Sequence, residues 1–216
     1  MKLKGLDYLD ISSLFSDDEI MIQHSVREFV DNEAMPIIDQ HFKDATFPNE
    51  LIPQFGAMNL LGVNLPEEYG CGGMSHVAYG LVCQELERCD SGVRSFVSVQ
   101  GSLVMYPIFA YGSEEQKKKW LPKLASGEAI GCFGLTEPDY GSNPGGMVTT
   151  AKKTDGGYIL NGAKMWITNG TVADIAVVWA KTEDGVVRGF IVEKGTEGFS
   201  APKMKNKWSL RASVTS

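Results

Sequence analysis

The sequence predicts an α+β fold, in which an all-α N-terminal domain is followed by an antiparallel, β-barrel-like domain. Up to about residue 128, apolar residues recur at helical spacing between capping signals. From residue 129 onward, short runs of β-branched and aromatic residues are separated by glycine, which is typical of strands and hairpins. Apolar residues make up 43% and charged residues 22% of the chain, a balance that supports a packed core. We therefore expect two domains, at residues 1–128 and 129–216.

The helices of the first domain are expected from their start signals. Ser16 and Glu19 form a capping box, and apolar residues follow it at three- and four-residue spacing. A second start lies at Ser113, where Glu114 and Glu115 are expected to form ion pairs with the lysines four residues later. The prolines at positions 36 and 107 are expected to end or kink their helices. Further helices are predicted over residues 37–43, 49–61, 75–88 and 94–111.

Three turn signals predict hairpins in the second domain. Asp155-Gly156, Asn161-Gly162 and Asp184-Gly185 each separate two runs of strand-like residues. Hairpins join antiparallel neighbours, and this is why an antiparallel sheet is expected.

Charge and hydropathy exclude several classes of protein. A formal net charge of −7 argues against nucleic acid or an anionic membrane as the main partner, because both require a basic surface. No apolar run approaches the roughly 18 to 20 residues that span a bilayer, so no membrane insertion is expected. The N-terminus lacks an apolar signal core. A cytoplasmic protein is the simplest expectation, and a processed protein of the mitochondrial matrix stays open.

The four cysteines indicate buried, reduced thiols. Cys71, Cys83, Cys89 and Cys132 form no Cys-x-x-Cys pair and have no histidine at metal-ligand spacing. The glycine-rich stretch at residues 67–73 lacks the G-x-G-x-x-G spacing and follows no strand, so a nicotinamide-binding unit is not supported. No Ser-His-Asp or Cys-His arrangement is found either.

The loop CFGLTEPDYGSNPGGM, residues 132–147, is a candidate ligand site. Polar, glycine-rich loops are often simple turns, and that interpretation stays open. A binding role is favoured by Thr136, which follows an apolar strand, and by Gly141-Ser142, which permits close approach to the backbone. Trp166-Ile167-Thr168, which we expect at the end of the paired strand, supplies an aromatic plane and a second hydroxyl. A ring system with a polar edge would fit between the two stretches.

Arg94 and Ser98 form a second candidate pair. They lie four residues apart in a mostly apolar helix and therefore share a face. In one interpretation Arg94 pairs with a neighbouring carboxylate such as Glu87 or Asp90. In the other, the guanidinium and the hydroxyl bind a substrate carboxylate.

Four stretches resemble the acyl-CoA dehydrogenases and occur in that family's order. They are PEEYG at 66–70, YGSEEQKKKWLPKLASGE at 111–128, CFGLTEPDYGSNP at 132–144 and LNGAKMWITNG at 160–170. Residues 85–116 and 188–202 are most similar to the glutaryl-CoA dehydrogenases. The resemblance implies a flavoprotein tetramer with helical, β and C-terminal helical domains, of which the last is absent from this sequence and the second is truncated at its C-terminal end.

The resemblance also implies a set of site residues. The isoalloxazine ring of FAD would be held by two walls, formed by Phe133, Leu135, Thr136, Gly141 and Ser142 on one side and by Trp166, Ile167 and Thr168 on the other. The carboxylate of a glutaryl group would be held by Arg94, with Ser95 and Ser98, and Glu87 would belong to the same polar end of the pocket. Ser142 would also touch the acyl-CoA.

The implied reaction is α,β-dehydrogenation of an acyl-CoA, with decarboxylation of glutaconyl-CoA to crotonyl-CoA in the glutaryl subfamily. An electron-transfer flavoprotein is the implied acceptor. The catalytic base of the family is a glutamate of the C-terminal domain, beyond Ser216, so no catalytic residue is assigned here and the chain alone is expected to be inactive.

Three positions depart from the family pattern, namely Tyr106, Tyr140 and Asn143, and Tyr140 is expected to crowd the cofactor or the CoA path. Two alternatives stay open. One is a dehydrogenase for another short, branched or aromatic acyl-CoA, and the other is a non-catalytic folding or interaction module.

Overall fold

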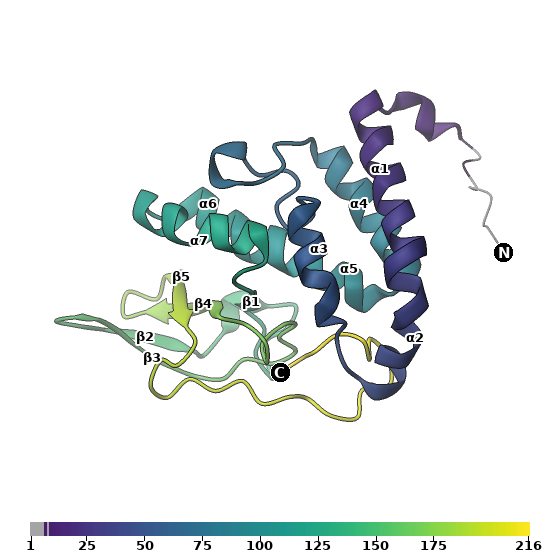
Figure 1. Cartoon of the computed structure of the whole chain (residues 1–216). Helices are drawn as coiled ribbons and strands as arrows, with labels where there is room; N and C mark the ends of the chain where they lie inside the picture. The colour runs from purple at the N-terminus through teal and green to yellow at the C-terminus, as the bar shows by residue number, and fades with distance from the viewer. Residues whose placement is uncertain (1–6, 8) are drawn as a thin grey trace.

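Helices lie above a five-stranded sheet in the computed structural model, which describes residue 7 and residues 9–216 (Figure 1). The helices are α1 (Asp17–Phe29), α2 (Met35–Asp44), α3 (Ile52–Ala57), α4 (His76–Cys89), α5 (Ser91–Ser98), α6 (Tyr106–Tyr111) and α7 (Glu114–Ser126). The strands are β1 (Gly131–Gly134), β2 (Thr150–Thr154), β3 (Gly157–Asn161), β4 (Ile175–Thr182) and β5 (Val187–Glu193). The predicted order, helical region first and β region second, is confirmed.

The predicted helix starts are also confirmed. At α1 the Ser16 hydroxyl accepts a hydrogen bond from the Glu19 amide, and the Glu19 carboxylate accepts one from the Ser16 amide. Ser113 and Gln116 form the same reciprocal arrangement at α7. Each capping box satisfies two backbone donors that the helix itself cannot pair.

Two long helical stretches are interrupted by π-helical turns and continue through their prolines. Residues Val30–Ala34 (η2) separate α1 from α2, and residues Val99–Met105 (η5) separate α5 from α6. Pro36 and Pro107 each lie in the first turn of the following helix, where a missing amide hydrogen costs nothing. The stretch predicted from residue 94 begins three residues earlier, at Ser91.

Two local predictions for the helical region are wrong. The helix expected over residues 49–61 ends at Ala57, because Asn59 adopts a left-handed conformation with φ of 56° and turns the chain. On α7, Glu114 pairs with Lys117, one turn away, and Lys119 reaches Glu193 of β5 at 2.5 Å. The expected pairs with Lys118 and Lys119 are therefore replaced by a shorter local pair and by one between domains.

The sheet is mixed, which corrects the expected antiparallel arrangement. Its order is β1-β4-β2-β3, with β5 paired to β4. The β2–β3 and β4–β5 hairpins are antiparallel, as predicted from their turns, but β1 and β2 both run parallel to β4. The hairpin predicted at Asn161-Gly162 is absent. After β3 the chain returns to the loop that follows β1, where the Met165 amide bonds the Thr136 carbonyl at 2.9 Å.

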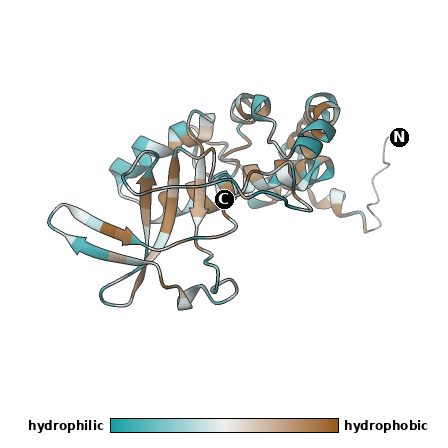
Figure 2. Ribbon diagram, turned by 90° about the horizontal axis from the view of Figure 1, so that it is seen from below, coloured by the Kyte–Doolittle hydropathy of each residue, from teal (hydrophilic) through white to brown (hydrophobic). Residues whose placement is uncertain are grey.

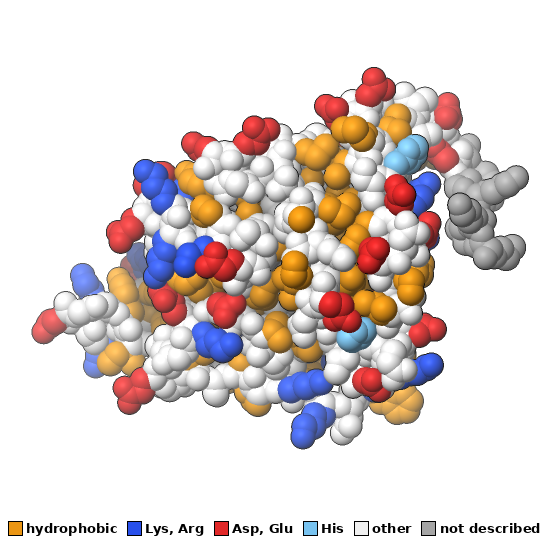
Figure 3. Space-filling view, viewed as in Figure 1, with side chains coloured by type: hydrophobic (Ala, Val, Ile, Leu, Met, Phe, Trp, Pro, Cys, Tyr) orange, Lys and Arg blue, Asp and Glu red, His pale blue; other side chains and the backbone are white. Residues whose placement is uncertain are grey.

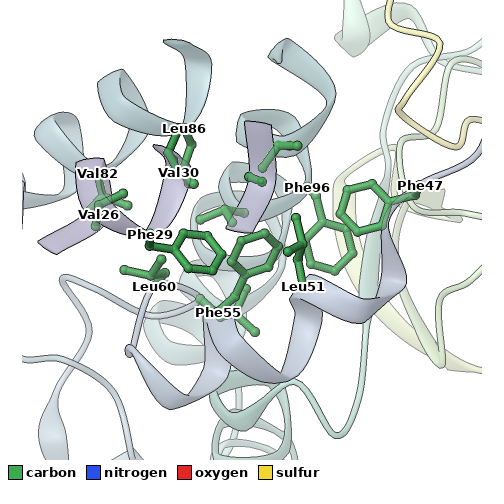
Figure 4. Packing of buried hydrophobic residues seen from close by; sticks show 14 of the residues in the cluster. Val26, Phe29, Val30, Phe47, Leu51, Phe55, Leu60, Val82, Leu86 and Phe96 are labelled. Atoms are coloured by element: carbon green, nitrogen blue, oxygen red, sulfur yellow. The ribbon is translucent and has the colours of Figure 1, made fainter. Parts of the chain in front are cut away.

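The helical core is built around aromatic rings (Figure 4). Phe47 and Phe96 stack with ring centroids 4.4 Å apart, and Phe29 meets Phe55 edge-on at 5.7 Å. The C-terminal segment contributes Ala212 to the same cluster, and Figure 1 shows this yellow segment passing along the sheet to the base of the helices. One core therefore joins the first and last parts of the described chain.

Gln100 joins the helices to the sheet. Its side chain is fully buried, and its amide nitrogen donates to the carbonyl oxygens of Leu124 and Ala129 at 3.0 and 2.8 Å. Its amide oxygen accepts from the Gly131 amide at 2.8 Å. The end of α7 and the start of β1 are thus fixed by one side chain.

The surface mixes both signs of charge, with acidic and basic side chains interspersed on the face in Figure 3. Within the described part of the chain, no helix is both long and apolar enough to cross a bilayer. Over the same residues, no cluster of three or more His, Cys, Asp or Glu forms a metal site. Cys71 and Cys132 are buried and Cys83 and Cys89 are half-buried, and all four are free thiols.

Replacing Gln100 with leucine is expected to lower the free energy of unfolding by about 3 kcal/mol, because it leaves the buried Gly131 amide and Ala129 carbonyl unpaired. The Leu124 carbonyl keeps its bond from the Gly127 amide. Urea denaturation of the variant measures this loss. Gln84→Leu, at an exposed position of α4, is the control and should stay close to the unsubstituted chain. Equal stabilities of the Gln100 variant and the unsubstituted chain would contradict the role of Gln100 in joining the helices to the sheet.

Candidate functional site

The loop after β1 is held in shape by a tight turn. The amide of Glu137 donates to the carbonyl of Tyr140 and the amide of Tyr140 donates to the carbonyl of Glu137, both at 3.2 Å. Adding a Cβ to Gly146 would place it 2.5 Å from the Tyr140 ring, so this ring lies across Gly146 within its own loop. The Tyr140 ring, which was expected to crowd the cofactor or the CoA path, therefore packs against its own loop.

Glu137 and Lys164 form a buried ion pair at the base of this loop. Their side chains are only 1% and 11% exposed, and Lys164 Nζ lies 2.8 Å from the Glu137 carboxylate. The same carboxylate accepts hydrogen bonds from the amides of Val148 and Thr149, at 2.7 and 3.0 Å. Lys164 also donates to the Leu135 carbonyl at 3.1 Å. The pair thus fastens three segments to one another.

The pKa of Glu137 reflects two opposing effects. Burial raises it, but the hydrogen bonds from Lys164, Thr149 and the backbone of residues 148 and 149 outweigh burial and bring the pKa to about 2. The carboxylate is therefore ionised throughout the neutral range.

The two predicted walls meet at this clamp. The Met165 amide donates a hydrogen bond to the Thr136 carbonyl of the first wall. Trp166, the first residue of the second wall, is the next residue in the chain. Trp166 to Thr168 lie in an irregular segment after β3, which corrects their expected place at a strand end. Thr168 pairs with Thr215 of the C-terminal segment, and the Ile167 amide donates to the carbonyl of Ser216 at 2.8 Å.

Several groups around this junction are open to a ligand. The Trp166 side chain is 58% exposed, and its backbone adopts φ of 64°, a strained value for a large residue. Among the residues that the structure describes, the hydroxyls of Thr136 and Thr168 form no side-chain hydrogen bond. Gly141 and Ser142 are exposed, with open space beside Gly141. An exposed indole with a threonine hydroxyl on each of the two adjoining stretches matches a planar group with a polar edge.

Two residues predicted for the same walls point elsewhere. Phe133 packs edge-on against Trp179, with ring centroids 6.0 Å apart, on the side of the sheet that carries the helices. Ile167 is 8% exposed and packs on the other face of the sheet. The side chains of both residues belong to the core, and the Ile167 amide and carbonyl are already hydrogen-bonded to Ser216.

Arg94 pairs with Glu87 and also faces Ser98. Its Nε lies 2.6 Å from the Glu87 carboxylate, and its guanidinium donates to the Ser98 hydroxyl at 3.3 Å. The structure therefore shows the ion pair that one interpretation expected, while leaving Arg94 35% exposed. Hydrogen bonds from Ser91 and Arg94 lower the pKa of Glu87, although its burial acts in the opposite direction. Ser95 contributes its carbonyl oxygen, which accepts from Ser98 at 3.2 Å.

A cleft of about 810 Å³ lies over the face of the sheet that points away from the helices. Its walls include Val178, Phe190, Ile191 and Val192, and Figure 2 shows these strands as largely apolar. Of the predicted flavin-site residues, only Ile167 lines it. Lys164 and Thr149 of the clamp also line the cleft, so the cleft adjoins the junction of Thr136 with Trp166.

Sequence reasoning missed Lys164 and assigned no partner to Glu137. Lys164 is the one cation in the stretch from Asn161 to Asp174, and Glu137 follows an apolar strand. A single cation in one stretch, and a glutamate directly after an apolar strand in the other, were the available signal.

Comparison with known proteins agrees with this architecture. The model of the acyl-CoA dehydrogenase N-terminal domain matches residues 16–128, and that of the middle domain matches residues 132–216. The chain belongs to the acyl-CoA dehydrogenase family. It is 41% identical over 204 residues to an acyl-CoA dehydrogenase of Bacillus subtilis, a match that covers 93% of this chain and 54% of the relative. It is 37% identical to the mitochondrial isovaleryl-CoA dehydrogenase of Arabidopsis thaliana, covering 94% of this chain and 51% of the relative.

Among solved structures, a glutaryl-CoA dehydrogenase from Mycobacterium smegmatis in complex with FADH2 is highly similar. It has 56% identity and a TM-score of 0.94, and the match covers 97% of this chain and 54% of that one. A glutaryl-CoA dehydrogenase complex with glutaryl-CoA matches with 33% identity and a TM-score of 0.89, over 100% of this chain and 54% of that one. The chain thus spans about half the length of the relatives it matches.

Acid is expected to weaken the clamp. Because the pKa of Glu137 falls from 4.5 to about 2 on folding, its contribution is complete above about pH 4.5 and is lost as the pH falls toward 2. The shift corresponds to about 3 kcal/mol. Urea unfolding of the unsubstituted chain and of Glu137→Gln at pH 7, 5, 4 and 3 isolates this contribution, since the difference between them should shrink with falling pH.

The exposed variant Glu183→Gln controls for the loss of one carboxylate. A stability difference between Glu137→Gln and the unsubstituted chain that is the same at pH 7 and pH 3 would contradict the assignment.

Proposed function

We propose that this chain carries the flavin-binding and acyl-binding parts of an FAD-dependent acyl-CoA dehydrogenase that acts on glutaryl-CoA. The observation that carries the dicarboxylate preference is the half-exposed Arg94, which faces both Glu87 and Ser98. A guanidinium in this setting can exchange one carboxylate for another. The similarity to glutaryl-CoA dehydrogenases supports the same substrate class.

The junction of the two walls fits FAD. Thr136 and Thr168 hold free hydroxyls for the polar edge of a ring, and the exposed Trp166 offers a plane for its apolar part. Ser142 and the open space beside Gly141 give room for the rest of the cofactor and for the acyl-CoA. Bound FAD supplies the two-electron acceptor for the dehydrogenation.

The residues of this chain orient the substrate. Arg94 and Ser98 hold the distal carboxylate, and the Glu137–Lys164 clamp keeps the wall residues in place. No glutamate of this chain is assigned as the base, since the family resemblance places it beyond Ser216. In the glutaryl reaction, the carboxylate of glutaconyl-CoA then leaves as CO2, and the resulting dienolate takes up a proton at its terminal carbon to give crotonyl-CoA.

The partners follow from the same proposal. We infer an electron-transfer flavoprotein as acceptor and a homotetramer for the whole enzyme. A solved structure from work on the electron transferring flavoprotein of Acidaminococcus fermentans is similar to this chain, with 36% identity and a TM-score of 0.89, over 93% of this chain and 54% of that one.

A second candidate is a dehydrogenase for a short or branched acyl group that carries no carboxylate. It is favoured by the sequence similarity to isovaleryl-CoA and short-chain specific acyl-CoA dehydrogenases, at 37% and 36% identity. Substrate preference separates the two candidates.

Titration of FAD with the chain tests the cofactor site. We expect quenching of flavin fluorescence, and we expect Trp166→Ala to weaken binding about fivefold to tenfold through loss of the ring contact. Trp208→Ala is the matched control, because Trp208 is 97% exposed and lies outside both walls. Flavin fluorescence that stays unchanged at high protein concentration would support a non-catalytic module.

Calorimetric titration with glutaryl-CoA and with butyryl-CoA tests the substrate class. Arg94→Ala is expected to weaken glutaryl-CoA binding by about 2 kcal/mol, or roughly thirtyfold, and to leave butyryl-CoA binding nearly unchanged. Arg188→Ala, which removes an exposed guanidinium paired with Asp184, is the control. An equal loss for both esters would favour the second candidate.

A further inference from the structure

A polar seam runs between α4 and the helical stretch formed by α5 and η5. On each side, its members recur every four residues and are at least partly exposed. The members on α4 are Tyr79, Cys83 and Glu87, and those on the opposite side are Arg94, Ser98 and Ser102. Most of the inward-facing residues of α4 are apolar, so this stripe is an exception within the domain.

The π-helical turn keeps the seam aligned. In a regular α-helix of 3.6 residues per turn, a residue eight positions after Arg94 would point about 80° away from it. The wider turn of η5 begins directly after Ser98 and reduces this rotation. Ser102 therefore faces Tyr79, and its hydroxyl lies 2.6 Å from the Tyr79 hydroxyl.

The hydroxyl pair has one hydrogen to offer. Ser102 donates its hydrogen to the Tyr79 oxygen, so the hydrogen that remains is that of Tyr79. Its partner within the chain is the Cys83 thiol, and sulfur is only a weak acceptor. Burial raises the pKa of Tyr79 to about 12, so its proton stays in place at neutral pH. The neighbouring Cys83 also has a raised pKa through burial and remains a neutral thiol. At this end the seam is uncharged and able to donate, whereas Arg94 carries the charge at the other end.

η5 also contacts β1, the strand that leads directly to the loop at Thr136. Ser102 therefore lies on the segment that packs against the strand leading to the proposed flavin wall, and Tyr79 faces Ser102 from α4. Arg94 lies two helical turns away from Ser102 along the same side.

We propose that the Tyr79–Ser102 hydroxyl pair is a specificity-determining part of the acyl site, which favours acyl groups with a polar, carboxylate-bearing tail over alkyl tails of the same length. An alkyl tail in the seam would cover the hydroxyls without replacing their hydrogen bonds with water. A carboxylate tail accepts the spare hydrogen. This inference rests on the proposed function and extends it beyond Arg94 and Ser98.

The test compares glutaryl-CoA with pentanoyl-CoA, which has the same chain length and no carboxylate, on the FAD-loaded chain. Dissociation constants are measured by calorimetry for the unsubstituted chain, for Tyr79→Phe and for Ser102→Ala. Each substitution is expected to reduce the preference for glutaryl-CoA about tenfold, because pentanoyl-CoA binds more tightly and glutaryl-CoA more weakly. Tyr111→Phe and Ser25→Ala remove hydroxyls from the exposed surface and should leave the preference unchanged.

The readout separates specificity from structure. If the pair only holds the helices together, both variants lose stability in urea while the ratio of the two dissociation constants stays the same, and that result overturns the inference. A ratio unchanged in these variants but reduced in Arg94→Ala overturns it while sparing the proposed function. Failure of the unsubstituted chain to bind either ester overturns both.

Discussion

The buried ion pair between Glu137 and Lys164 is the interaction on which the candidate site depends. Moving two charges out of water is costly, and such a pair is retained only where further hydrogen bonds complete its coordination. Here the carboxylate accepts two backbone amides and the ammonium donates to a backbone carbonyl. An apolar pair of equal volume could fill the same space but could not satisfy these three backbone groups. The charge pair therefore holds in one geometry the three segments that bear Thr136, Thr149 and Trp166.

β1 is fixed at both of its ends, and this connects the helical half to the site. Gln100 bonds the amide of Gly131, where the strand begins, and the clamp holds the loop just beyond Gly134, where it ends. Gly131 also has to be glycine, since a Cβ there would lie 2.3 Å from the Val104 side chain of η5. β1 is only four residues long, so the contacts that fix its two ends lie close together. The relative placement of Arg94 and Thr136 is thus a consequence of packing around one short strand.

Local signals in the sequence predicted the elements well, whereas contacts between distant segments were beyond them. Capping boxes at Ser16 and Ser113 marked helix starts correctly because both partners lie within three residues. Asn161-Gly162 carries the same local signal as the two true hairpin turns, but its chain returns to Thr136 instead of pairing with β4. The parallel pairing of β1 with β4 depends on contacts across more than 40 residues. For the same reason the walls of the site could be listed from the sequence, while the clamp between them could not.

The two ion pairs of the site differ in burial. The buried pair has a structural role, and the exposed pair has the binding role that we propose. Glu137 and Lys164 are 1% and 11% exposed, so breaking the pair would leave a buried charge without a partner. Glu87 and Arg94 are 44% and 35% exposed, and a pair so open to water stabilises the fold by about 1 kcal/mol or less. Opening the Glu87–Arg94 pair would therefore cost the fold little, and Glu87 orients the guanidinium while the pair is closed. The proposed exchange of carboxylates at Arg94 would leave the buried Glu137–Lys164 pair, and the segments that it holds, in place.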